Sequence, residues 1–542
     1  MKKALLFMVF GLAFIALVGC QTTTANPSTQ VTSSNLTTQS SSGNPGSTTT
    51  QSSSSSSTTQ SSNSSSTLPT TSSTGSPTTT KPTQSSFWDA NGNGIPDWTE
   101  QKITLKYATW QHTSADIVTI ESLMVNAFMA KYPNITVEFQ MMGASSEEWD
   151  SNFIAAVESN TLPDVFLVNR LASFLPFNIL ANISDYYNND PDTQFLFDSV
   201  KELGMYNGKR YAIPTMIYPT MWIVNLDILD AAGVNIPGYD WTYQQMASIA
   251  QATTNENTHI MGMYGCSFYN RELPKVLKIA AATSNEELIA AKKWQSFSYD
   301  GNQFNFNDPV FLSAMTLLTD AVNGGYCVPG LSAAQLEERY LSSSFEPTYN
   351  GKVAMWRDAS WSAKNYFSQM LFEWDIYPGP NGVTGGNTDI AGVASTSLHK
   401  AAAYQFLKWM TYSEEGLLTR FQLFKDYADQ VYISANNYGY PVVDYGIDGF
   451  GVNKVWSAIP YGITAPGFVS PEFIESLRNG AYWVNKEVVG WDEADSVAYS
   501  YLYQTMIGQT TYAAIMELLQ VEVMIAYQNA RNTLDQMIRD LK

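Results

Sequence analysis

Apolar residues in the first globular segment repeat every two positions in some stretches and every three to four in others. The strand-like stretches are Ile103–Trp110, Ile135–Phe139 and Asp164–Val168. Between them, Ile117–Lys131 and Trp149–Glu158 have the apolar spacing of helices. Strands separated by helices of this length predict the α/β class, with a mostly parallel sheet and helices on both faces.

Later segments extend this pattern. Tyr211–Asn225 alternates around Pro214 and predicts a strand that crosses between two lobes, where a hinge would lie. Long helices are expected at Asp308–Val322, Lys400–Thr411 and Thr511–Leu541. No short repeat interrupts the order.

The first residues have the features of an export signal. Lys2 and Lys3 precede the apolar stretch Ala4–Val18, which is shorter than the roughly 20 residues that a membrane span needs. It ends at Leu17-Val18-Gly19-Cys20, which resembles the bacterial lipobox, where the cysteine receives a diacylglycerol. We therefore expect a lipoprotein signal peptide before Cys20 and attachment to the outer face of the cell membrane. The alternative is an ordinary signal peptide with a chance cysteine.

Residues 20–86 are expected to form a tether. Gln21–Ser86 is built almost wholly from Ser, Thr, Gln, Asn, Pro and Gly, with Lys81 as its only charge. Such a segment buries too little apolar surface to offset the entropy of ordering, so we expect it to be disordered. A flexible coil of this length spans roughly 45 Å.

Charge and cysteine content narrow the possible partners. The formal net charge is −20, and removing Lys2 and Lys3 with the signal peptide would make it −22. A strongly acidic surface argues against nucleic-acid binding. Cys266 and Cys327 fit no metal or redox spacing, and either a disulfide or two buried thiols is compatible with the sequence.

Residues 87–101 contain a calcium-binding motif. The segment from Asp89 to Glu100 matches D-x-[DN]-x-[DN]-G-x5-E, in which Gly94 permits the sharp turn. Two asparagines replace aspartates, which lowers the charge of the site, and the alternative is an Asn/Gly-rich hinge. The expected ligands of a structural Ca²⁺ are Asp89, Asn91, Asn93, the backbone carbonyl of Ile95, Asp97 and Glu100.

From about Lys102 onward the chain resembles the family 1 extracellular solute-binding proteins, the maltose-binding type. The resemblance rests on short motifs that occur in the family's order, and it weakens after Ser434. The motifs are Tyr132-Pro-Asn-Ile135, Leu162-Pro-Asp-Val-Phe166, Gly208-Lys-Arg-Tyr-Ala-Ile-Pro214, Asn225-x-Asp227, Trp241-Thr242, Gly351-Lys-Val-Ala-Met355, Ala359-Ser-Trp361, Tyr377-Pro-Gly-Pro380 and Ala402-Ala-Tyr-Gln-Phe-Leu-Lys-Trp409.

The resemblance implies a two-lobe fold with a cleft between the lobes and capture of the ligand by hinge closure. The first lobe is expected to hold residues 102–211 and 391–434, and the second residues 212–390 and 435–542. It also implies a monomer that needs no cofactor for binding, takes a carbohydrate as ligand and works with the permease subunits of an ABC transporter.

Candidate ligand residues follow from this resemblance and from sugar chemistry. A flat ring covers the apolar face of a sugar, while polar groups meet its hydroxyls. Arg357-Asp358 is either part of the site or a surface ion pair, and Trp491-Asp492 is a weaker candidate. The expected ligand-binding residues are Trp110, Asn169, Arg170, Tyr218 and Trp361, with Trp361 as the main stacking ring.

Signs of catalysis are scarce. The sequence has no G-x-S-x-G, no P-loop and no H-E-x-x-H, and its three histidines are widely separated. We therefore expect that the protein is not an enzyme. A secreted glycoside hydrolase is the rival hypothesis, because sequence alone does not exclude a pair of carboxylates about 5–10 Å apart. A carbohydrate sensor or adhesin without transport is the third.

Overall fold

The computed structural model describes residues 87–143, 146–363, 369–427, 430, 439–446, 448 and 452–540. The chain divides into residues 1–79 and a second unit, Thr80–Lys542, and the account below concerns the second unit alone. The predicted signal peptide, lipid-modified Cys20 and tether lie outside the described residues. Within the described residues, no helix is long and apolar enough to cross a membrane.

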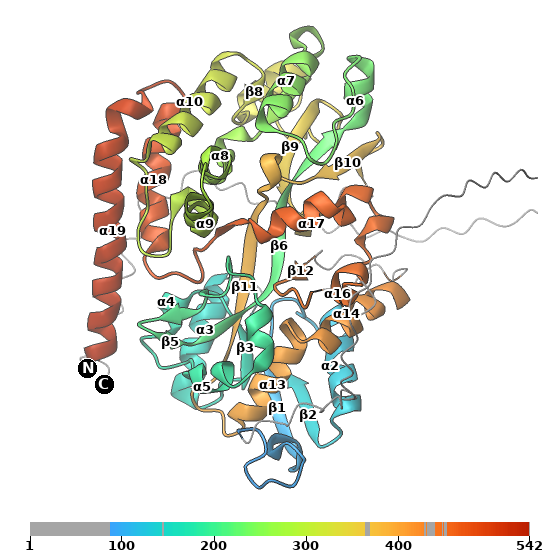
Figure 1. Cartoon of the computed structure of the whole chain (residues 1–542), viewed down its shortest axis with the longest axis vertical. Coiled ribbons are helices and arrows are strands. Elements are labelled where there is room, and N and C mark those ends of the chain that lie inside the picture. Colours follow the sequence, from blue (N-terminus) through green and yellow to red (C-terminus); the bar gives the residue numbers. More distant parts are fainter. Residues whose placement is uncertain are drawn as a thin grey trace, which may run out of the picture. The chain divides into compact units, whose positions relative to one another are not determined.

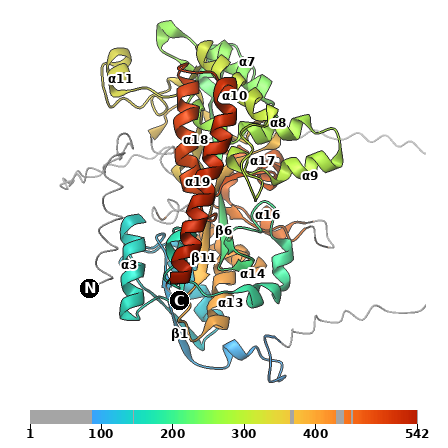
Figure 2. The ribbon, with the colours of Figure 1, turned by 90° about the vertical axis from the view of Figure 1, so that its left-hand side faces the viewer.

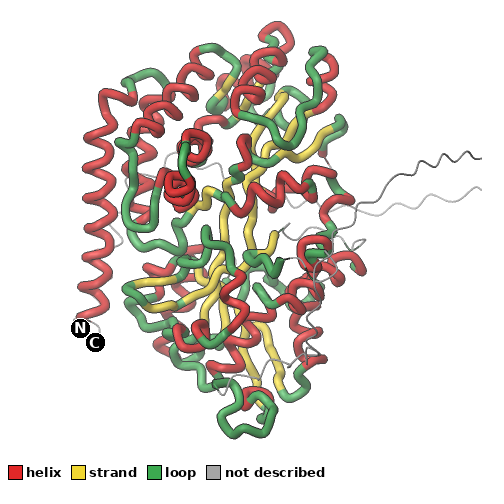
Figure 3. The backbone as a smooth tube through the Cα atoms, in the orientation of Figure 1, coloured by secondary structure: helices red, strands yellow, loops and turns green. Residues whose placement is uncertain are grey.

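One large sheet runs through this unit, with helices on both sides of it (Figure 1, Figure 3). Its main strand order is β2-β1-β3-β11-β6-β9-β7-β8, and β10, β12 and β13 pair at its sides. The strands are β1 (Ile103–Ala108), β2 (Ile135–Phe139), β3 (Val165–Val168), β6 (Ala212–Asn225), β7 (Met261–Tyr264), β8 (Cys327–Val328), β9 (Val353–Ala359), β10 (Trp374–Tyr377), β11 (Gly385–Val393), β12 (Tyr440–Pro441) and β13 (Ala481–Trp483), and β4 (Met205–Tyr206) with β5 (Lys209–Arg210) forms a separate hairpin.

One long strand, β6, joins the two ends of the sheet. β6 pairs near Ala212 with β11, which also pairs with β3, and near Asn225 with β9 and β10. All 14 residues of β6 are buried. The expected crossover at Tyr211–Asn225 is therefore confirmed as a strand that runs through both ends of the sheet.

The sheet is less parallel than the sequence predicts. β1 is parallel to β2 and β3, and β7 is parallel to β8 and β9. However, the pairings of β6 with β9, β10, β11 and β12 are antiparallel, and β11 runs antiparallel to β3. The expectation of a mostly parallel sheet holds only toward its ends, because a strand that returns through the middle must reverse direction.

The helices agree closely with the predicted ranges. Thr119 caps the helix that was expected from Ile117, through a reciprocal pair of hydrogen bonds with Ser122, so that helix begins at Ile120. The helices are α2 (Ile120–Lys131), α3 (Ser146–Ser159), α4 (Leu171–Phe174), α5 (Ser184–Asn188), α6 (Leu226–Ala231), α7 (Tyr243–Thr253), α8 (Leu273–Ala281), α9 (Asn285–Lys293), α10 (Pro309–Asn323), α11 (Ala333–Tyr340), α13 (Lys400–Thr411), α14 (Glu414–Asp426), α16 (Lys454–Ser457), α17 (Pro471–Arg478), α18 (Trp491–Met506) and α19 (Tyr512–Asp540).

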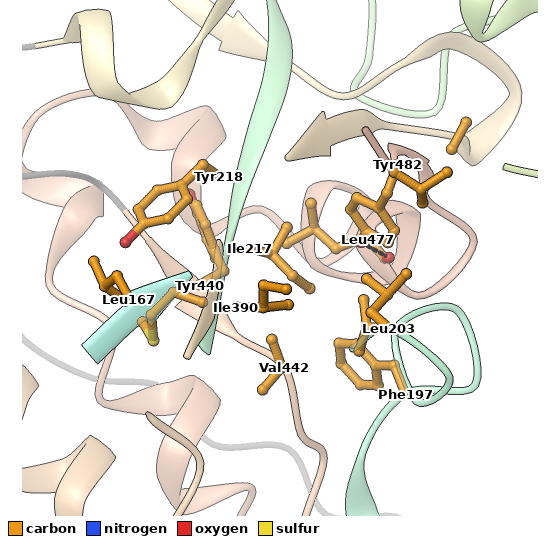
Figure 4. Close-up of a cluster of buried hydrophobic side chains, with 14 of the residues drawn as sticks. Leu167, Phe197, Leu203, Ile217, Tyr218, Ile390, Tyr440, Val442, Leu477 and Tyr482 are labelled. Carbon is orange, nitrogen blue, oxygen red and sulfur yellow. Dashed lines mark hydrogen bonds between the residues drawn. The ribbon is translucent and has the colours of Figure 1, made fainter. Parts of the chain in front are cut away.

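The core continues through the region where β6, β11 and β12 meet. Figure 4 shows Ile217 and Ile390 close together, with Tyr440 on one side of them and Leu477 on the other. All four of these side chains are buried. Burial of this kind stabilises by roughly 25 cal/mol per Å² of apolar surface removed from water, so the middle of the sheet is tightly packed rather than loosely linked.

The first described residues are fixed to the folded unit. Trp88 is 8% exposed, and its indole stacks on Tyr404 at 6.0 Å and lies 5.9 Å from Tyr186. Its Nε1 donates to the backbone oxygen of Asn189 at 3.1 Å. The chain therefore becomes anchored at Trp88, immediately before the calcium motif.

A disulfide joins Cys266 and Cys327, whose Cα atoms are 6.2 Å apart. Cys327 begins β8, and Cys266 follows β7, its parallel neighbour. The two possibilities left by the sequence are thus resolved in favour of the disulfide, which closes the edge of the sheet.

Candidate functional site

Three side chains from three adjacent strands share one face of the sheet. Tyr218 of β6 pairs in register with Asn387 of β11, and Asn387 pairs in register with Trp483 of β13. Side chains directly opposite in a sheet lie on the same face. The sequence positions 218, 387 and 483 are therefore adjacent, and we refer to these residues with Trp110 and Trp361 as the aromatic site.

A buried ion pair supports this face from the side of β9. The guanidinium of Arg357 donates to both carboxylate oxygens of Glu272, and the hydroxyl of Thr220 donates to the same carboxylate at 3.1 Å. Glu272 fits because Gly385 leaves room for it: a Cβ at position 385 would lie 1.9 Å from its carboxylate. Such a pair fixes geometry, because removing one partner leaves a buried charge uncompensated.

Trp483 is held between two guanidinium groups. The Arg271 guanidinium carbon lies 4.6 Å from its ring centroid, and that of Arg357 lies 5.2 Å away. Its Nε1 is buried and has no hydrogen-bond partner among the described residues, and the same is true of Oδ1 of Asn387. An unpaired buried donor and an unpaired buried acceptor on adjacent strands can be satisfied by a bound polar molecule.

Trp361 and Tyr218 are in contact. Their ring centroids are 6.3 Å apart in an edge-to-face arrangement. Trp361 is 38% exposed, whereas Tyr218 is only 5% exposed. The Tyr218 hydroxyl accepts a hydrogen bond of 2.7 Å from the side-chain amide of Gln111. The most exposed ring of the site therefore rests on a tyrosine that is itself held in place.

Trp110 lies at the other end of the group, immediately before Gln111. It packs edge-to-face on Trp149 of α3 at 5.1 Å, and the Lys486 ammonium lies 5.0 Å from its ring centroid. Lys486 is paired with Asp389 of β11 at 2.7 Å. This pair raises the pKa of Lys486 against the opposing effect of burial, so its charge persists beside Trp110.

Asn169 and Arg170 follow β3 and lie beside the aromatic site rather than within it. The side-chain amide of Asn169 donates to Asp150 of α3 at 3.2 Å. Arg170 is exposed, and its Nε lies 3.3 Å from Asp492 of α18. The next residue, Leu171, donates its backbone N–H to the oxygen of Lys486 at 2.9 Å.

The remaining candidates divide. Arg357 is paired with Glu272 and not with Asp358, so the idea of an Arg357-Asp358 surface ion pair is wrong: the two side chains point to opposite faces of β9. Trp491 is 2% exposed and stacks on Phe297 at 5.8 Å, so it belongs to the core.

Two carboxyl groups near the site have pKa values raised by burial. The pKa of Glu487, next to Lys486, is raised to about 8, and one of its oxygens is buried with no hydrogen-bond partner in the part of the chain that the structure describes. The pKa of Asp492 is raised to about 6, although Arg170 acts in the opposite direction.

Asn387, Trp483, Lys486 and Gln111 are site residues that the sequence did not predict. Trp483 and Lys486 lie after Ser434, where the motif matches are weak. Gln111 adjoins the predicted Trp110, which is the one local signal that could have indicated it.

The calcium motif forms a compact turn. Asp89 accepts backbone N–H groups of Asn93 at 3.1 Å and Gly94 at 2.8 Å, and Glu100 accepts the side-chain amides of Asn91 and Asn93. Oδ1 of Asp97 is buried, and no described residue forms a hydrogen bond with it. No group of three or more His, Cys, Asp or Glu residues in the described ranges could hold a metal, so any site here would depend on amide and carbonyl oxygens.

Solved structures with the same fold are numerous. An ABC substrate-binding protein from Listeria monocytogenes, in complex with cycloalternan, is 20% identical with a TM-score of 0.52, over 80% of this chain and 100% of its own. A cyclic alpha-maltosyl-1,6-maltose binding protein from Arthrobacter globiformis is 16% identical with a TM-score of 0.56, over 79% and 99%. A sugar transporter structure from Rhizobium etli, in an open conformation, is 18% identical with a TM-score of 0.56, over 78% and 99%. A comparison with curated proteins found no match.

These likenesses confirm the expected two-lobe α/β fold. The model of one protein family, "Bacterial extracellular solute-binding protein", matches residues 113–416, which is more than half of the chain. The matched range includes Tyr218, Trp361 and Asn387. The family and the similar structures are binding proteins, so this chain belongs to the bacterial extracellular solute-binding protein family.

Proposed function

We propose that this protein captures a carbohydrate outside the cell and delivers it to the permease of an ABC transporter, as a monomer. The observation that carries the proposal is the aromatic site. Exposed Trp361 contacts Tyr218, whose neighbours across the strands, Asn387 and Trp483, each carry a buried polar atom without a partner among the described residues. A ring for the apolar face of a sugar and a donor–acceptor pair for its hydroxyls are what carbohydrate recognition requires. The sugar ligands named for the Listeria and Arthrobacter proteins support this class.

The proposed capture step is closure of two lobes about β6 and β11. We propose the lobe boundaries expected from the sequence, except that residues 442–444 belong to the first lobe. Phe197 donates its backbone N–H to Val442, and Asp444 donates to Phe195, which associates residues 442–444 with the first lobe.

Two of the carboxyl groups beside the site are held in ion pairs, which favours binding over catalysis. Glu272 is paired with Arg357, and Asp389 is paired with Lys486. A glycosidase needs one carboxyl group that can donate a proton and another free to act as base or nucleophile. Neither of these ion-paired groups meets the description. Glu487 and Asp492, whose pKa values are raised by burial, are the carboxyl groups that a hydrolase would have to use, and we propose instead that the sugar leaves unchanged.

A carbohydrate panel measured by thermal shift tests the function. A sugar at 100 times its dissociation constant should stabilise the protein by about 2.7 kcal/mol. Cycloalternan and cyclic alpha-maltosyl-1,6-maltose belong in the panel, and sugar recovered from the complex should be intact. Stabilisation by none of the sugars would count against the carbohydrate class, and shortened products would favour the hydrolase.

We also propose attachment to the outer face of the cell membrane through Cys20. Two acyl chains anchor a protein stably, whereas one binds only marginally, and a diacylglycerol supplies two. Cys20→Ala should release the protein to the medium or leave it unprocessed. Mature-length Cys20→Ala protein in the membrane fraction would contradict the anchor.

The calcium motif is proposed as a structural site. The loop carries the hard oxygen ligands that the motif requires, and among the described residues Oδ1 of Asp97 has no hydrogen-bond partner. Bound there, Ca²⁺ would stiffen the turn between Trp88 and β1.

A further inference from the structure

α19 makes contacts at both ends of the unit. Its 29 residues extend over roughly 43 Å at 1.5 Å per residue. Figure 1 shows it along the outer side of the unit, beside α18, running from the neighbourhood of α10 toward the side where β5 lies, and Figure 2 also shows α18 and α10 beside it.

The first half of α19 is fixed to the part of the chain that follows β6. Tyr512 stacks on Phe311 at 5.4 Å and donates its hydroxyl to the oxygen of Phe306 at 2.7 Å. Gln520 accepts the backbone N–H of Phe306 at 2.7 Å and donates to Phe304 at 2.9 Å. The start of this helix therefore belongs to the proposed second lobe.

The last part of α19 contacts the β4–β5 hairpin, which precedes β6. Asp535 accepts a hydrogen bond of 2.7 Å from the Tyr206 hydroxyl and another of 3.1 Å from the Asn207 side chain. The hairpin is fixed to the proposed first lobe, because the Arg210 guanidinium stacks on Tyr187 at 3.8 Å and the backbone oxygen of Arg210 accepts the N–H of Ile183.

Arg531 connects these two sets of contacts. Its guanidinium lies 5.1 Å from the Tyr206 ring and 5.4 Å from the Tyr527 ring, and it donates to the backbone oxygen of Val489 at 3.5 Å. Val489 lies in the segment between β13 and α18. Arg531 therefore touches the hairpin, its own helix and a connecting segment.

We propose that α19 is a strap that holds the two lobes at their present angle and releases at the contact of Asp535 with Tyr206 and Asn207. This rests on the proposed function, since hinge closure is the motion that the strap limits. Because the start of α19 is fixed to the second lobe, the whole helix moves with that lobe. A rotation of one lobe relative to the other would therefore separate the end of α19 from the hairpin of the first lobe. The release point is polar and small, which suits a contact that forms and breaks repeatedly.

Spin labels on the two lobes test the strap without any ligand. Glu158→Cys in α3 and Thr316→Cys in α10 are exposed positions. They are introduced on a full chain carrying Cys20→Ala, in which Cys266 and Cys327 remain paired and do not label. Distance distributions from double electron–electron resonance are compared between this chain and the same chain with Asp535→Ala.

We expect the release variant to show a second distance population at least five times larger than in the parent. Asp540→Asn is the matched control, because it removes one charge from the same helix end, where Asp540 accepts a hydrogen bond from Gln536 of that helix. Tyr206→Phe serves if Asp535→Ala folds poorly, since it keeps the ring beneath Arg531 and removes the hydroxyl.

An unchanged distribution in a folded release variant would overturn the strap, as would an equal change in the Asp540→Asn control. The outcome is separate from the carbohydrate assay. A chain that binds no sugar but gains the second population upholds the strap and not the function, and a chain that binds sugar with no change in distances does the reverse.

Discussion

The side-chain amide of Gln111 donates to the hydroxyl of Tyr218 across 107 residues of sequence, at 2.7 Å. This bond joins the loop after β1 to the strand that runs through both ends of the sheet. It also fixes the residue next to Trp110 against the residue beneath Trp361. The two ends of the aromatic site are thereby held at one spacing.

Tyr218→Phe should lower the free energy of unfolding by about 1 kcal/mol, because Gln111 loses its acceptor. Carbohydrate affinity should also fall, since the loop that carries Trp110 is then less constrained. Denaturant unfolding and calorimetric titration on the same preparation measure both effects. Tyr503→Phe, at an exposed tyrosine of α18, should change neither. Equal results for the two variants would remove the bond from the site.

Trp361→Ala should weaken binding about tenfold and leave the melting temperature nearly unchanged, because this ring is 38% exposed. Trp222→Ala is the contrasting control: Trp222 is 1% exposed and should cost about 3–5 kcal/mol of stability. If Trp361→Ala instead destabilises strongly and the folded fraction binds normally, the ring is a packing residue.

Glu487 makes stability depend on pH. Its folded pKa of about 8 exceeds the usual value of 4.5, so the folded state retains a proton that the unfolded state has lost between these pH values. Stability contributed by the neutral form is therefore full below pH 4.5 and falls as pH rises to 8.

Glu487→Gln should flatten this slope, and the variant should be the more stable protein at pH 9. The ceiling of the effect is about 1.4 kcal/mol for each pH unit that separates the two pKa values. Glu493→Gln, at the start of α18, is the control. If the melting temperature changes with pH in the same way for Glu487→Gln and the unmodified chain between pH 5 and 9, the carboxyl group is not kept neutral.

The disulfide should matter most to the unfolded state. Cys266 and Cys327 are 61 residues apart, and closing a loop of that length stabilises by about 4 kcal/mol on the chain-entropy estimate, within a usual range of about 2–5. Replacing both cysteines with serine should lower the urea midpoint accordingly. Reducing agent should have the same effect on the natural chain and none on the double variant. Unfolding curves that coincide under oxidising conditions would argue against the bond.

Calcium should raise the melting temperature of the natural chain relative to the chain in chelator. The gain in the free energy of unfolding should be about 2.7 kcal/mol when the free Ca²⁺ concentration is 100 times the dissociation constant. Glu100→Gln should abolish the difference, because it removes the one ligand expected to bind through two oxygens. Asp116→Asn removes an exposed carboxylate outside the loop and should leave it intact. A calcium response that survives Glu100→Gln would move the ion elsewhere.

Local patterns predicted the elements well. The helix Lys400–Thr411 and the strand Ile135–Phe139 have the expected bounds, because periodicity and flanking residues act over a few positions. Candidate site residues came from the sequence only where a strand end or a motif marked them, as at Trp110 and Trp361, and their role in binding stays a prediction. Trp483 enters through its pairing with Asn387, across 96 positions, and no local pattern records such a pairing.

The anchorage of Trp88 has a mechanical consequence. A pull on the chain that precedes Phe87 reaches the folded unit at this indole, which is held by Tyr404, Tyr186 and Asn189. The load therefore enters the folded unit in the packing around α13 and α5. A pull along the preceding chain is therefore expected to act first on the contacts of this indole, before it acts on the strands of the sheet.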